Sequence, residues 1–415
     1  MSKINDLIKE LCPNGVEYKT IKETFYLFSG MTGVSNKWAD EGNCQFIDYM
    51  NAYKNNKINV KNTPYATVKN LRQNELKKGD LLLTSASEVP DECAVSAVIE
   101  DDIKNGVFMD DHLFGLRLKE EYSDRINTTF INYYLNSKPF RNTLFKAVRG
   151  VTRFYVSNDN YVKLLIPIPP LEVQDEIVRI LDKFDELEAE LEAELEARKR
   201  QYEFWRDSLL KEKTTKEYKL KEVVDLYLGL TYTPNYVEEG VKFLSSLNIS
   251  KGYLDLKSIK YISKDEFENS TSNAKPKKGD ILYVRVGSNL GHPVIYDLEE
   301  DVCVFVSVGF ARVKNTNILS NKYLKYWMDS DLFMDQVKSK TMNSPKANLN
   351  ASWMKEFTIF IPSLEKQNEI VQILDKFDKL INDISIGLPA EIELRKKQYE
   401  YYRNKLLDFD GKSDE

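Results

Sequence analysis

Histidines, cysteines and acidic side chains carry most enzyme chemistry, and this sequence offers few of them in a catalytic arrangement. His112 and His292 are its two histidines. Neither has a cysteine, carboxylate or second histidine at the spacing expected for a metal site. Pro90-Asp91-Glu92 has the proline–acid order that begins a metal-dependent nuclease site, but no acid-x-Lys pair follows on a strand. A loop tip is therefore the better interpretation, and the sequence predicts a chain that is not an enzyme.

Motifs for nucleotides and cofactors are also missing. No GxxxxGK[ST] loop occurs, and no GxGxxG follows a strand. The glycines of VGSNLG at 286–291 have the wrong spacing for a nucleotide site and indicate a turn. IPIPP at 166–170 lacks the asparagine of the Asn-Pro-Pro-aromatic sequence found in amino-methyltransferase pockets. We therefore expect no metal site, no cofactor and no methyl-transfer site in this chain.

The composition is that of a globular protein. The residues are 42% hydrophobic and 30% charged. The length of 415 residues suggests two to four domains. No apolar run approaches the ~18–20 residues that span a bilayer, and charged residues interrupt the N-terminal stretch MSKINDLIKELC where a signal peptide would be apolar. The four cysteines form no CxxC pair, which excludes an ordinary zinc cluster and a disulfide framework. A cytoplasmic location without a membrane partner is expected.

The net charge of −6 conceals an uneven distribution. Residues 171–217 and 364–415 carry net charges of −6 and −3, whereas 1–170 and 218–363 carry +1 and +2. Net charge therefore neither supports nor excludes nucleic acid as a partner.

The chain contains an internal duplication. EIVRILDKFD at 176–185 returns as EIVQILDKFD at 369–378, and RKRQYEFWR at 198–206 returns as RKKQYEYYR at 395–403. Weaker matches upstream keep the same order: KKGDLL at 77–82 with KKGDIL at 277–282, and FINYYLNS at 130–137 with YLKYWMDS at 323–330. A period of about 200 residues is too long for a solenoid, so the duplication indicates two copies of a two-part module.

The closely matching segments predict long helices. Apolar residues recur at steps of three and four from Val173 to Leu209, and neither glycine nor proline occurs between Leu171 and Leu210. In the second copy GLPAEIE at 387–393 predicts a kink or two shorter helices. IPIPPLE and IFIPSLE predict a last strand followed by a helix start.

The variable units read as mixed α/β structure. DLLLTS at 80–85, AVSAVI at 94–99 and DILYVRV at 280–286 predict strands, and VCVFVSVGFARV at 302–313 predicts one half-buried strand. The stretches 130–145 and 323–337 predict amphipathic helices.

This arrangement resembles the specificity subunit of type I restriction–modification systems. The resemblance rests on LCPNGVEYKTIKE at 11–23, on both IP-x-LE-x-Q-x-EIV-x-ILDKFD segments and on both RK-x-QYE-x-x-R tails. It extends over essentially the whole chain. The variable units match only in position.

The resemblance implies a non-catalytic subunit that binds double-stranded DNA. Each variable unit would be a target recognition domain for one half of a split site, and the helices would form an antiparallel coiled coil that docks two methyltransferase subunits. S-adenosylmethionine, Mg and ATP would be used by partner subunits, namely the methyltransferases and the restriction/translocase subunits.

The implied fold is α+β, with two globular α/β recognition domains separated by two long helices and related by a pseudo-two-fold repeat. A two-fold arrangement of the modules makes the helices antiparallel and turns the two DNA readers toward half-sites of opposite orientation. Because the variable units differ in sequence, the target should be asymmetric. The expected parts are recognition domain 1 at 1–165, a central conserved helix at 166–217, recognition domain 2 at 218–358 and a C-terminal conserved helix at 359–415.

Polar loops supply the candidate DNA contacts. Arginine can read guanine and asparagine adenine through paired hydrogen bonds, whereas lysine mostly anchors phosphate. Arg285 could instead pair with a carboxylate of its own domain. The candidates are Lys146, Arg149, Thr152, Arg153 and Tyr155 in the first unit, and Arg285, Ser288, Asn289, Lys340, Asn343, Lys346 and Asn348 in the second.

Bulky residues of the repeated helices are candidates for partner contacts. They are larger than a narrow coiled-coil seam requires, although coiled-coil packing is the simpler explanation for the aliphatic positions. The partner-binding candidates are Gln174, Phe184, Tyr202, Trp205, Gln367, Phe377, Tyr399 and Tyr402.

Two alternatives remain open at this point. One is a self-sufficient nuclease or methyltransferase, which would need a motif that the sequence lacks. The other is a non-catalytic coiled-coil scaffold with two protein-binding heads. The repeat ELEAELEAELEA at 186–197 fits a rigid rod better than a flexible linker, because alanine, leucine and glutamate favour helix.

Overall fold

The computed structural model describes residues 2–61, 63–211, 216–287, 289–341, 348–383 and 386–409. The chain divides into two compact units: unit 1 consists of Met1–Glu190 and Ile392–Glu415, and unit 2 of Leu191–Glu391. Helix α7 (Leu171–Leu210) begins in unit 1 and ends in unit 2, and α14 (Leu388–Leu406) begins in unit 2 and ends in unit 1. None of the described helices combines the length and the apolar character needed to cross a membrane.

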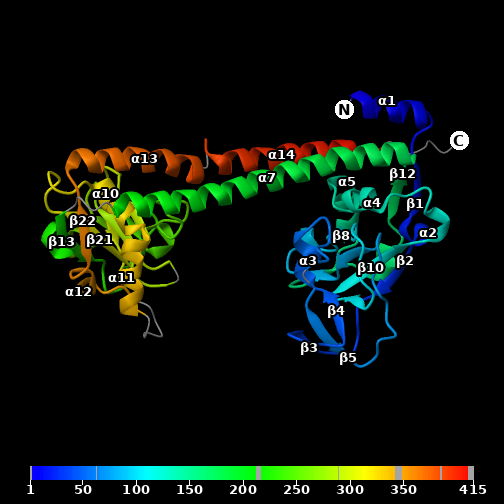
Figure 1. Ribbon diagram of the computed structural model, residues 1–415, viewed down its shortest axis with the longest axis horizontal. Helices are drawn as coiled ribbons and strands as arrows, with labels where there is room; N and C mark the ends of the chain where they lie inside the picture. The colour runs from blue at the N-terminus through cyan, green and yellow to red at the C-terminus, as the bar shows by residue number, and fades with distance from the viewer. Residues whose placement is uncertain are drawn as a thin grey trace. The chain divides into compact units, whose positions relative to one another are not determined.

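Unit 1 is built on two four-stranded sheets and two strand pairs (Figure 1). The first sheet has the order β2 (Phe25–Ser29), β10 (Leu113–Leu118), β6 (Leu81–Thr84), β8 (Ser96–Val98). The second has the order β3 (Val34–Ala39), β5 (Tyr65–Val68), β4 (Cys44–Ile47), β9 (Val107–Met109). The pairs are β1 (Glu17–Thr20) with β12 (Leu165–Ile168), and β7 (Ala86–Ser87) with β11 (Phe154–Tyr155). Its helices before α7 are α1 (Ser2–Leu11), α2 (Ile21–Thr24), α3 (Tyr49–Lys54), α4 (Thr128–Leu135), α5 (Lys138–Phe145) and α6 (Asn158–Tyr161).

Unit 2 repeats this topology. Its sheets have the orders β14 (Val224–Leu228), β21 (Val308–Val313), β18 (Ile281–Val284), β19 (Pro293–Ile295), and β15 (Tyr236–Val237), β17 (Lys260–Ile262), β16 (Val241–Leu244), β20 (Val302–Val304). Strand β13 (Lys216–Lys219) pairs with β22 (Thr358–Ile361). Its other helices are α8 (Leu220–Val223), α9 (Lys264–Asn269), α10 (Asn321–Met328), α11 (Asp331–Thr341), α12 (Ala351–Met354) and α13 (Leu364–Asn382). The shared topology confirms the duplication in the regions where the sequences diverge most.

One predicted strand is wrong. The alternating segment 302–313 forms two strands, β20 and β21, because Val302–Val304 pairs with β16 in one sheet and Val308–Val313 pairs with β14 and β18 in the other. A turn at 305–307 separates them, and apolar alternation alone does not reveal a turn that passes between two sheets.

The KKGD motif recurs because its aspartate fixes a turn in each unit. In unit 1 the carboxylate of Asp80, 1% exposed, accepts two hydrogen bonds from Arg117, at 2.8 and 2.6 Å. In unit 2 Asp280 accepts equivalent bonds from Arg312, at 2.9 and 2.6 Å. Both carboxylates also accept a bond from the backbone of the first lysine of the motif. A buried carboxylate that lost this bidentate partner would remain uncompensated.

The repeated segments form the predicted helices. Helix α7 is unbroken over 40 residues, about 60 Å at ~1.5 Å per residue. The second copy is divided into α13 and α14, as GLPAEIE indicated. A Cβ at Gly387 would lie 2.6–2.8 Å from the carbonyl oxygens of Lys379, Asp383 and Leu380, so only glycine permits this close approach.

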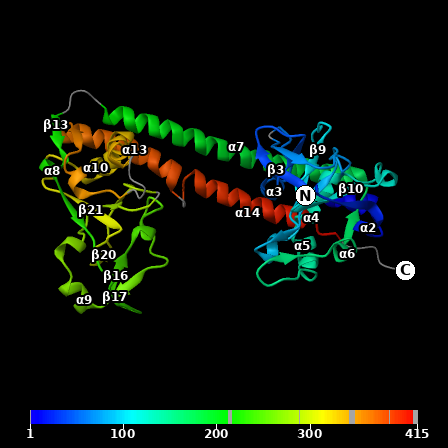
Figure 2. The same cartoon turned by 90° about the horizontal axis from the view of Figure 1, so that it is seen from below.

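Within each unit, part of α7 packs beside a helix of the other copy (Figure 2). In unit 1 the partner is α14, and the direction is antiparallel: Phe184 contacts Tyr402, whereas Glu188, one turn further along α7, pairs with Lys396 at 3.2 Å. In unit 2 the partner is α13, where Phe377 contacts Tyr202. The aliphatic stripe Val173, Ile177, Leu181 is buried in the core of unit 1, and Ile370, Leu374 and Ile381 are buried in that of unit 2.

Candidate functional site

In each unit, a strand end and a polar loop that are far apart in sequence come together. In unit 1, β7 pairs with β11 in the register Ala86–Tyr155. In unit 2, Val286 forms the equivalent antiparallel bridge with Asn348. The two KKGD motifs place Ala86 and Val286 at the same position of the repeat. In unit 2 the structure therefore joins the loop after Arg285 to the loop at 339–350, which are separate in the sequence. We call the paired segments, at Ala86–Tyr155 in unit 1 and Val286–Asn348 in unit 2, the loop frame.

The five candidates of unit 1 all lie on the surface of this frame. Lys146, Arg149, Thr152, Arg153 and Tyr155 are exposed. The turn between Arg149 and Arg153 depends on Gly150, which has φ +127°, and a Cβ there would lie 2.0 Å from the carbonyl oxygen of Arg153. The guanidinium of Arg149 donates to the carbonyls of Lys146 and Val148, at 3.0 and 2.8 Å.

These cations remain available to a ligand. No ion pair involves Lys146, Arg149 or Arg153 within the described part of the chain. Thr152 and Arg153 line a hollow of about 550 Å³ together with Tyr49, Glu92 and His112. The loop thus presents cations and hydroxyls beside a depression in the surface.

In unit 2 the predicted DNA contacts include one buried residue, Arg285, and several exposed residues. Arg285 is 7% exposed, and its guanidinium donates to the backbone carbonyls of Val306 at 2.8 Å and Leu349 at 3.3 Å. Its prediction as a DNA contact is therefore wrong: the side chain holds two loops of its own unit together. Its partners are carbonyls and not the carboxylate considered as the alternative.

The remaining candidates of unit 2 are exposed where they are described. Asn289 donates from its amide to the carbonyl of Ser250 at 2.8 Å, and Lys340 lies near the end of α11. Asn348 is exposed beside Val286. Ser288, Asn343 and Lys346 lie outside the described residues.

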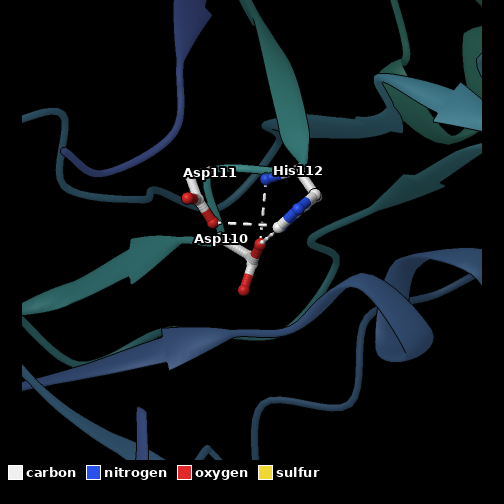
Figure 3. A group of neighbouring side chains, drawn as sticks. All are labelled: Asp110, Asp111 and His112. Carbon is white, nitrogen blue, oxygen red and sulfur yellow. Dashed lines mark hydrogen bonds and ion pairs between the residues drawn. The ribbon is translucent and has the colours of Figure 1, made fainter. Parts of the chain in front are cut away.

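A group of possible metal ligands lies next to the frame of unit 1 (Figure 3). The ring Nδ1 of His112 is 2.9 Å from a carboxylate oxygen of Asp110 and 3.1 Å from one of Asp111. The expectation that no carboxylate lies at ligand spacing from His112 was therefore wrong, because the turn brings neighbours in sequence together. The ammonium of Lys37 lies 3.0 Å from Asp110 and 2.5 Å from Asp111.

Lys37 supplies the positive charge that these carboxylates require. Burial alone would lower the pKa of its amine, but hydrogen bonds to Asp111 and Asp110 outweigh burial and raise that pKa above its ordinary value. A cation bound by the same oxygens would have to displace a charged lysine. The group is best explained as an ion-pair cluster that fixes the 110–112 turn.

The recurrent glutamines at the helix starts have no surface to offer a partner. Gln174 and Gln367 are both 0% exposed. The amide of Gln174 accepts from the backbone of Asn127 and donates to the carbonyls of Arg125 and Pro169, at 2.6–2.8 Å. Gln367 makes the same three contacts in unit 2, at 2.8–2.9 Å. Their prediction as partner-binding residues is wrong, and their recurrence reflects a buried hydrogen-bond network.

The LDKFD aspartates have a role that the sequence analysis missed. The single O–H of Tyr133 is shared between the carboxylates of Asp182 and Asp185, at 2.7 and 2.8 Å. In unit 2 Tyr326, the equivalent residue, donates to Asp375 at 2.6 Å. Burial, and then the charge of Asp185, raises the pKa of Tyr133 far above its ordinary value, so its hydroxyl remains a donor. The signal was available, since Tyr133 and Tyr326 match in the repeat alongside LDKFD.

The aromatic candidates on the helices separate into buried and exposed residues. Tyr202 and Tyr399 are 5% and 8% exposed, so their prediction as partner contacts is wrong, since both rings pack inside the helix pairs. Phe184, Phe377 and Tyr402 are partly buried in the same contacts. Trp205 is exposed and its ring forms an edge-to-face pair with that of Phe204. Phe204 was not among the predicted residues.

The second copy has an equivalent aromatic pair, in which one ring is exposed and the other is partly buried. Tyr401 and Tyr402 occupy the positions of Phe204 and Trp205 in the RK-x-QYE-x-x-R repeat, and their rings meet edge to face at 5.4 Å. Phe204 and Tyr401 are 65% and 59% exposed. Each conserved helix tail therefore presents one aromatic pair at the same repeat position.

Comparison with known proteins agrees with this arrangement. The family model described as type I restriction modification DNA specificity domain matches residues 13–197 and 212–394, so it is present twice. A type I restriction enzyme specificity subunit of Escherichia coli is 35% identical over 293 residues, covering 68% of this chain and 70% of the relative.

Solved structures share the fold. A chain from a structure on complex assembly and conformational transition of the type I R-M system aligns with a TM-score of 0.62 and 16% identity, over 95% of this chain and 98% of that chain. The S subunit of a type I restriction–modification system from M. genitalium aligns with a TM-score of 0.50 and 14% identity, over 95% and 96%. The two matched domains and the extent of the sequence similarity place this chain in the type I restriction–modification DNA specificity family, as a recognition subunit and not an enzyme.

Proposed function

We propose that this chain selects a split, asymmetric target in double-stranded DNA, with each unit reading one half-site. The observation that carries the proposal is the repeated frame, in which a strand end pairs with an exposed polar loop in both units. The loops occupy equivalent positions but present different side chains, Arg149 and Arg153 in one and Lys340 and Asn348 in the other. Different side chains on equivalent frames would read different bases, which accounts for an asymmetric target.

The side-chain chemistry suits the two tasks of a DNA reader. Arg149 and Arg153 are exposed guanidinium groups that can bind the O6 and N7 atoms of guanine, and Asn348 can bind adenine in the major groove. Lys146 and Lys340 would anchor phosphates without reading sequence. The segments 1–170 and 218–363 carry net charges of only +1 and +2, so phosphate attraction by the chain alone is small. We expect tight specific binding only in a complex with two methyltransferase subunits.

The aromatic pairs of the helix tails, with Phe204, Trp205 and Tyr401 exposed, are the proposed docking sites for those subunits. Phe204–Trp205 and Tyr401–Tyr402 recur at one position of the repeat, so two copies of one partner could bind in the same way. Aromatic residues are enriched at the centres of protein interfaces. S-adenosylmethionine would be bound by the methyltransferases, and Mg and ATP by the restriction subunits that join them, all in the cytoplasm.

Methylome sequencing of a bacterium that carries this chain with its methyltransferase subunit tests the proposal. The expected result is one bipartite motif with two different half-sites, a fixed number of unspecified bases between them, and a methylated base in each half. A matched strain in which only this chain is deleted should lose all methylation of that motif. Methylation that persists without the chain, or a continuous or symmetric motif, would contradict the proposal.

A further inference from the structure

Each unit presents a large aromatic ring at the outer strand of its second sheet. In unit 1 this is Trp38 on β3, which is 64% exposed. In unit 2 it is Tyr236 on β15, which is 43% exposed. Neither residue was a candidate in the sequence analysis, because the sequences of the two sheets are too different to align.

The two rings occupy equivalent places. The ring of Trp38 meets Phe46 at 5.6 Å and 75°, and that of Tyr236 meets Phe243 at 5.8 Å and 57°. Phe46 and Phe243 lie at the same position of the parallel strand pairs β4–β9 and β16–β20. Because an exposed ring contributes little to packing, its recurrence in two divergent units points to a contact with something outside the chain.

The backbone at Trp38 adopts a conformation that is rare for a bulky residue. Asn36 and Trp38 have φ of +48° and +68°, in the left-handed region that bulky residues rarely adopt. They lie in an irregularity of β3, between its pairings at Ser35 and Ala39. Such strain persists at functional sites more often than elsewhere. Here it belongs to a segment that holds the indole largely in solvent.

One short turn connects each ring to the polar loop of its unit. In unit 1 Lys37 pairs with Asp110 and Asp111, and the next residue, His112, lines the hollow that Thr152 and Arg153 share. In unit 2 Phe243 packs against Phe305 at 5.9 Å, and the next residue, Val306, accepts a hydrogen bond from Arg285 beneath the loop frame. A chain of contacts therefore runs from the aromatic ring to the polar loop in both units.

A positive charge lies beside the ring of unit 2. The ammonium of Lys260 lies 4.2 Å from the ring centroid of Tyr236. In unit 1 Lys69 is exposed directly after β5, and its backbone donates to the carbonyl of Gly33, at the end of β3 opposite Trp38. A ring beside a lysine can contact bases or deoxyribose while the lysine binds the neighbouring phosphate.

We propose that Trp38 and Tyr236 contact the DNA duplex directly, one ring at each half-site, beside the polar loop of the same unit. The inference rests on the proposed function and extends it from the loops to the second sheet. Each ring acts as an apolar contact against base edges or deoxyribose, so it contributes to affinity for its own half-site and not for the other.

The test uses the complex with two methyltransferase subunits and target DNA in which thymines in and beside each half-site are replaced by 5-iododeoxyuridine. Irradiation of this probe cross-links aromatic side chains that touch it. We expect cross-linked peptides that contain Trp38 from one half-site and Tyr236 from the other. Cross-linking confined to other peptides would overturn the inference.

Substitutions supply the second measurement. Trp38→Asn removes the ring and suits the positive φ, and Tyr236→Ala removes the ring in unit 2. Each should weaken binding about five-fold or more, as expected for one lost aromatic–base contact, and half-site exchange should assign the loss to one half only. Trp38→Phe should recover most of the affinity. Tyr26→Ala removes another ring that is 62% exposed in unit 1 and should leave binding unchanged.

The failures are distinguishable. Wild-type complex that shows no preference for the target would overturn the proposed function itself. Specific binding by the wild type that is unchanged in Trp38→Asn and Tyr236→Ala would overturn only this inference. Equal thermal unfolding of the variants and the wild type establishes that any loss comes from contact and not from misfolding.

Discussion

Phe184 stacks on Tyr402 in unit 1, with ring centroids 5.6 Å apart and planes inclined by 27°. The two residues belong to different copies of the repeated segment. Phe184 also packs on Tyr399, and the reciprocal of this second contact exists in unit 2, where Phe377, the counterpart of Phe184, packs on Tyr202, the counterpart of Tyr399. Each unit therefore contains the start of one conserved helix and the tail of the other. Neither copy of the repeat is a complete unit by itself.

Truncation of Phe184 should destabilise unit 1. The ring contacts both Tyr399 and Tyr402, and Phe184→Ala should lower the free energy of unfolding by about 3 kcal/mol, the lower end for a core phenylalanine because the ring is only partly buried. Urea unfolding of the full chain measures this. Phe204→Ala, on the exposed face of the same helix, is the control and should change stability by no more than ~0.5 kcal/mol. Equal changes in the free energy of unfolding for the two substitutions would show that the stacked contact does not stabilise unit 1.

The Tyr326–Asp375 bond predicts a loss of stability in acid. Burial acts to raise the pKa of Asp375, but hydrogen bonds from Lys322 and Tyr326 outweigh it and hold that pKa below its ordinary value. Since the folded pKa is lowered, the stabilisation is present above the unfolded value of ~3.9 and is lost as the pH falls through the folded value. Tyr326→Phe should therefore reduce stability at pH 7 by about 1.5–3 kcal/mol, as for a hydrogen bond to a charged group, and should weaken the acid dependence.

Urea unfolding at pH 7 and at pH 3 separates these effects. Tyr49→Phe is the matched control, because the hydroxyl of Tyr49 donates to a carbonyl, that of Ala86, at 3.2 Å. It should lower stability by a similar amount at both pH values. A Tyr326→Phe variant with the full acid dependence of the wild type would refute the role assigned to this bond.

The reading loops predict substitutions that affect one half-site each. Arg149→Ala and Arg153→Ala should weaken recognition of one half-site, and Lys340→Ala and Lys346→Ala that of the other. Loss of an arginine that reads a base should weaken binding by about 1–3 kcal/mol and relax specificity at that base. Loss of a lysine that binds phosphate should reduce the salt dependence of binding. Competition binding with DNA altered in one half-site distinguishes the two. Arg179→Ala, at an exposed helix arginine paired with Glu176, is the control, and unchanged binding in all four loop variants would exclude these loops.

The aromatic pairs predict the stoichiometry of the complex. Substitution of Phe204 and Trp205 by alanine should remove one of two methyltransferase subunits, and Tyr401→Ala should weaken binding of the other. If the rings are interface anchors, each change should reduce the binding free energy by about 2 kcal/mol or more. Native mass spectrometry of the purified complex counts the bound subunits. Leu394→Ala, at an apolar residue of α14 that is 67% exposed, should leave two subunits bound. Retention of both subunits by the aromatic variants would place the docking sites elsewhere.

The sequence predicted the helices and the duplication better than the surfaces. An uninterrupted run without glycine or proline sufficed to define α7, and the repeat located β12 and β22 before the helix starts. The functions of Gln174 and Arg285 could not be predicted, because the carbonyls that bind them come from segments distant in sequence. Trp38 was missed for a related reason: its exposure depends on the backbone conformation of β3, which no periodicity reports.

The ELEAELEAELEA segment at 186–197 provides the last prediction, a change in the spacing of the DNA target. The segment lies inside the unbroken helix α7, and its leucines follow one stripe, since four residues advance the helix by about 400°. Asp185 and Arg198 enclose 12 residues, whereas Asp378 and Arg395 enclose 16 around the junction of α13 and α14. One added ELEA lengthens α7 by ~6 Å, against ~3.4 Å of rise per base pair. We expect the variant to keep both half-site sequences and to change the unspecified gap by one or two base pairs, as read by methylome sequencing. A matched variant with four further residues between Asn382 and Leu388 should restore the pairing of Glu188 with Lys396 and recover activity if the single insertion loses it. Altered half-sites, or an unchanged gap in an active complex, would show that this segment does not set the spacing.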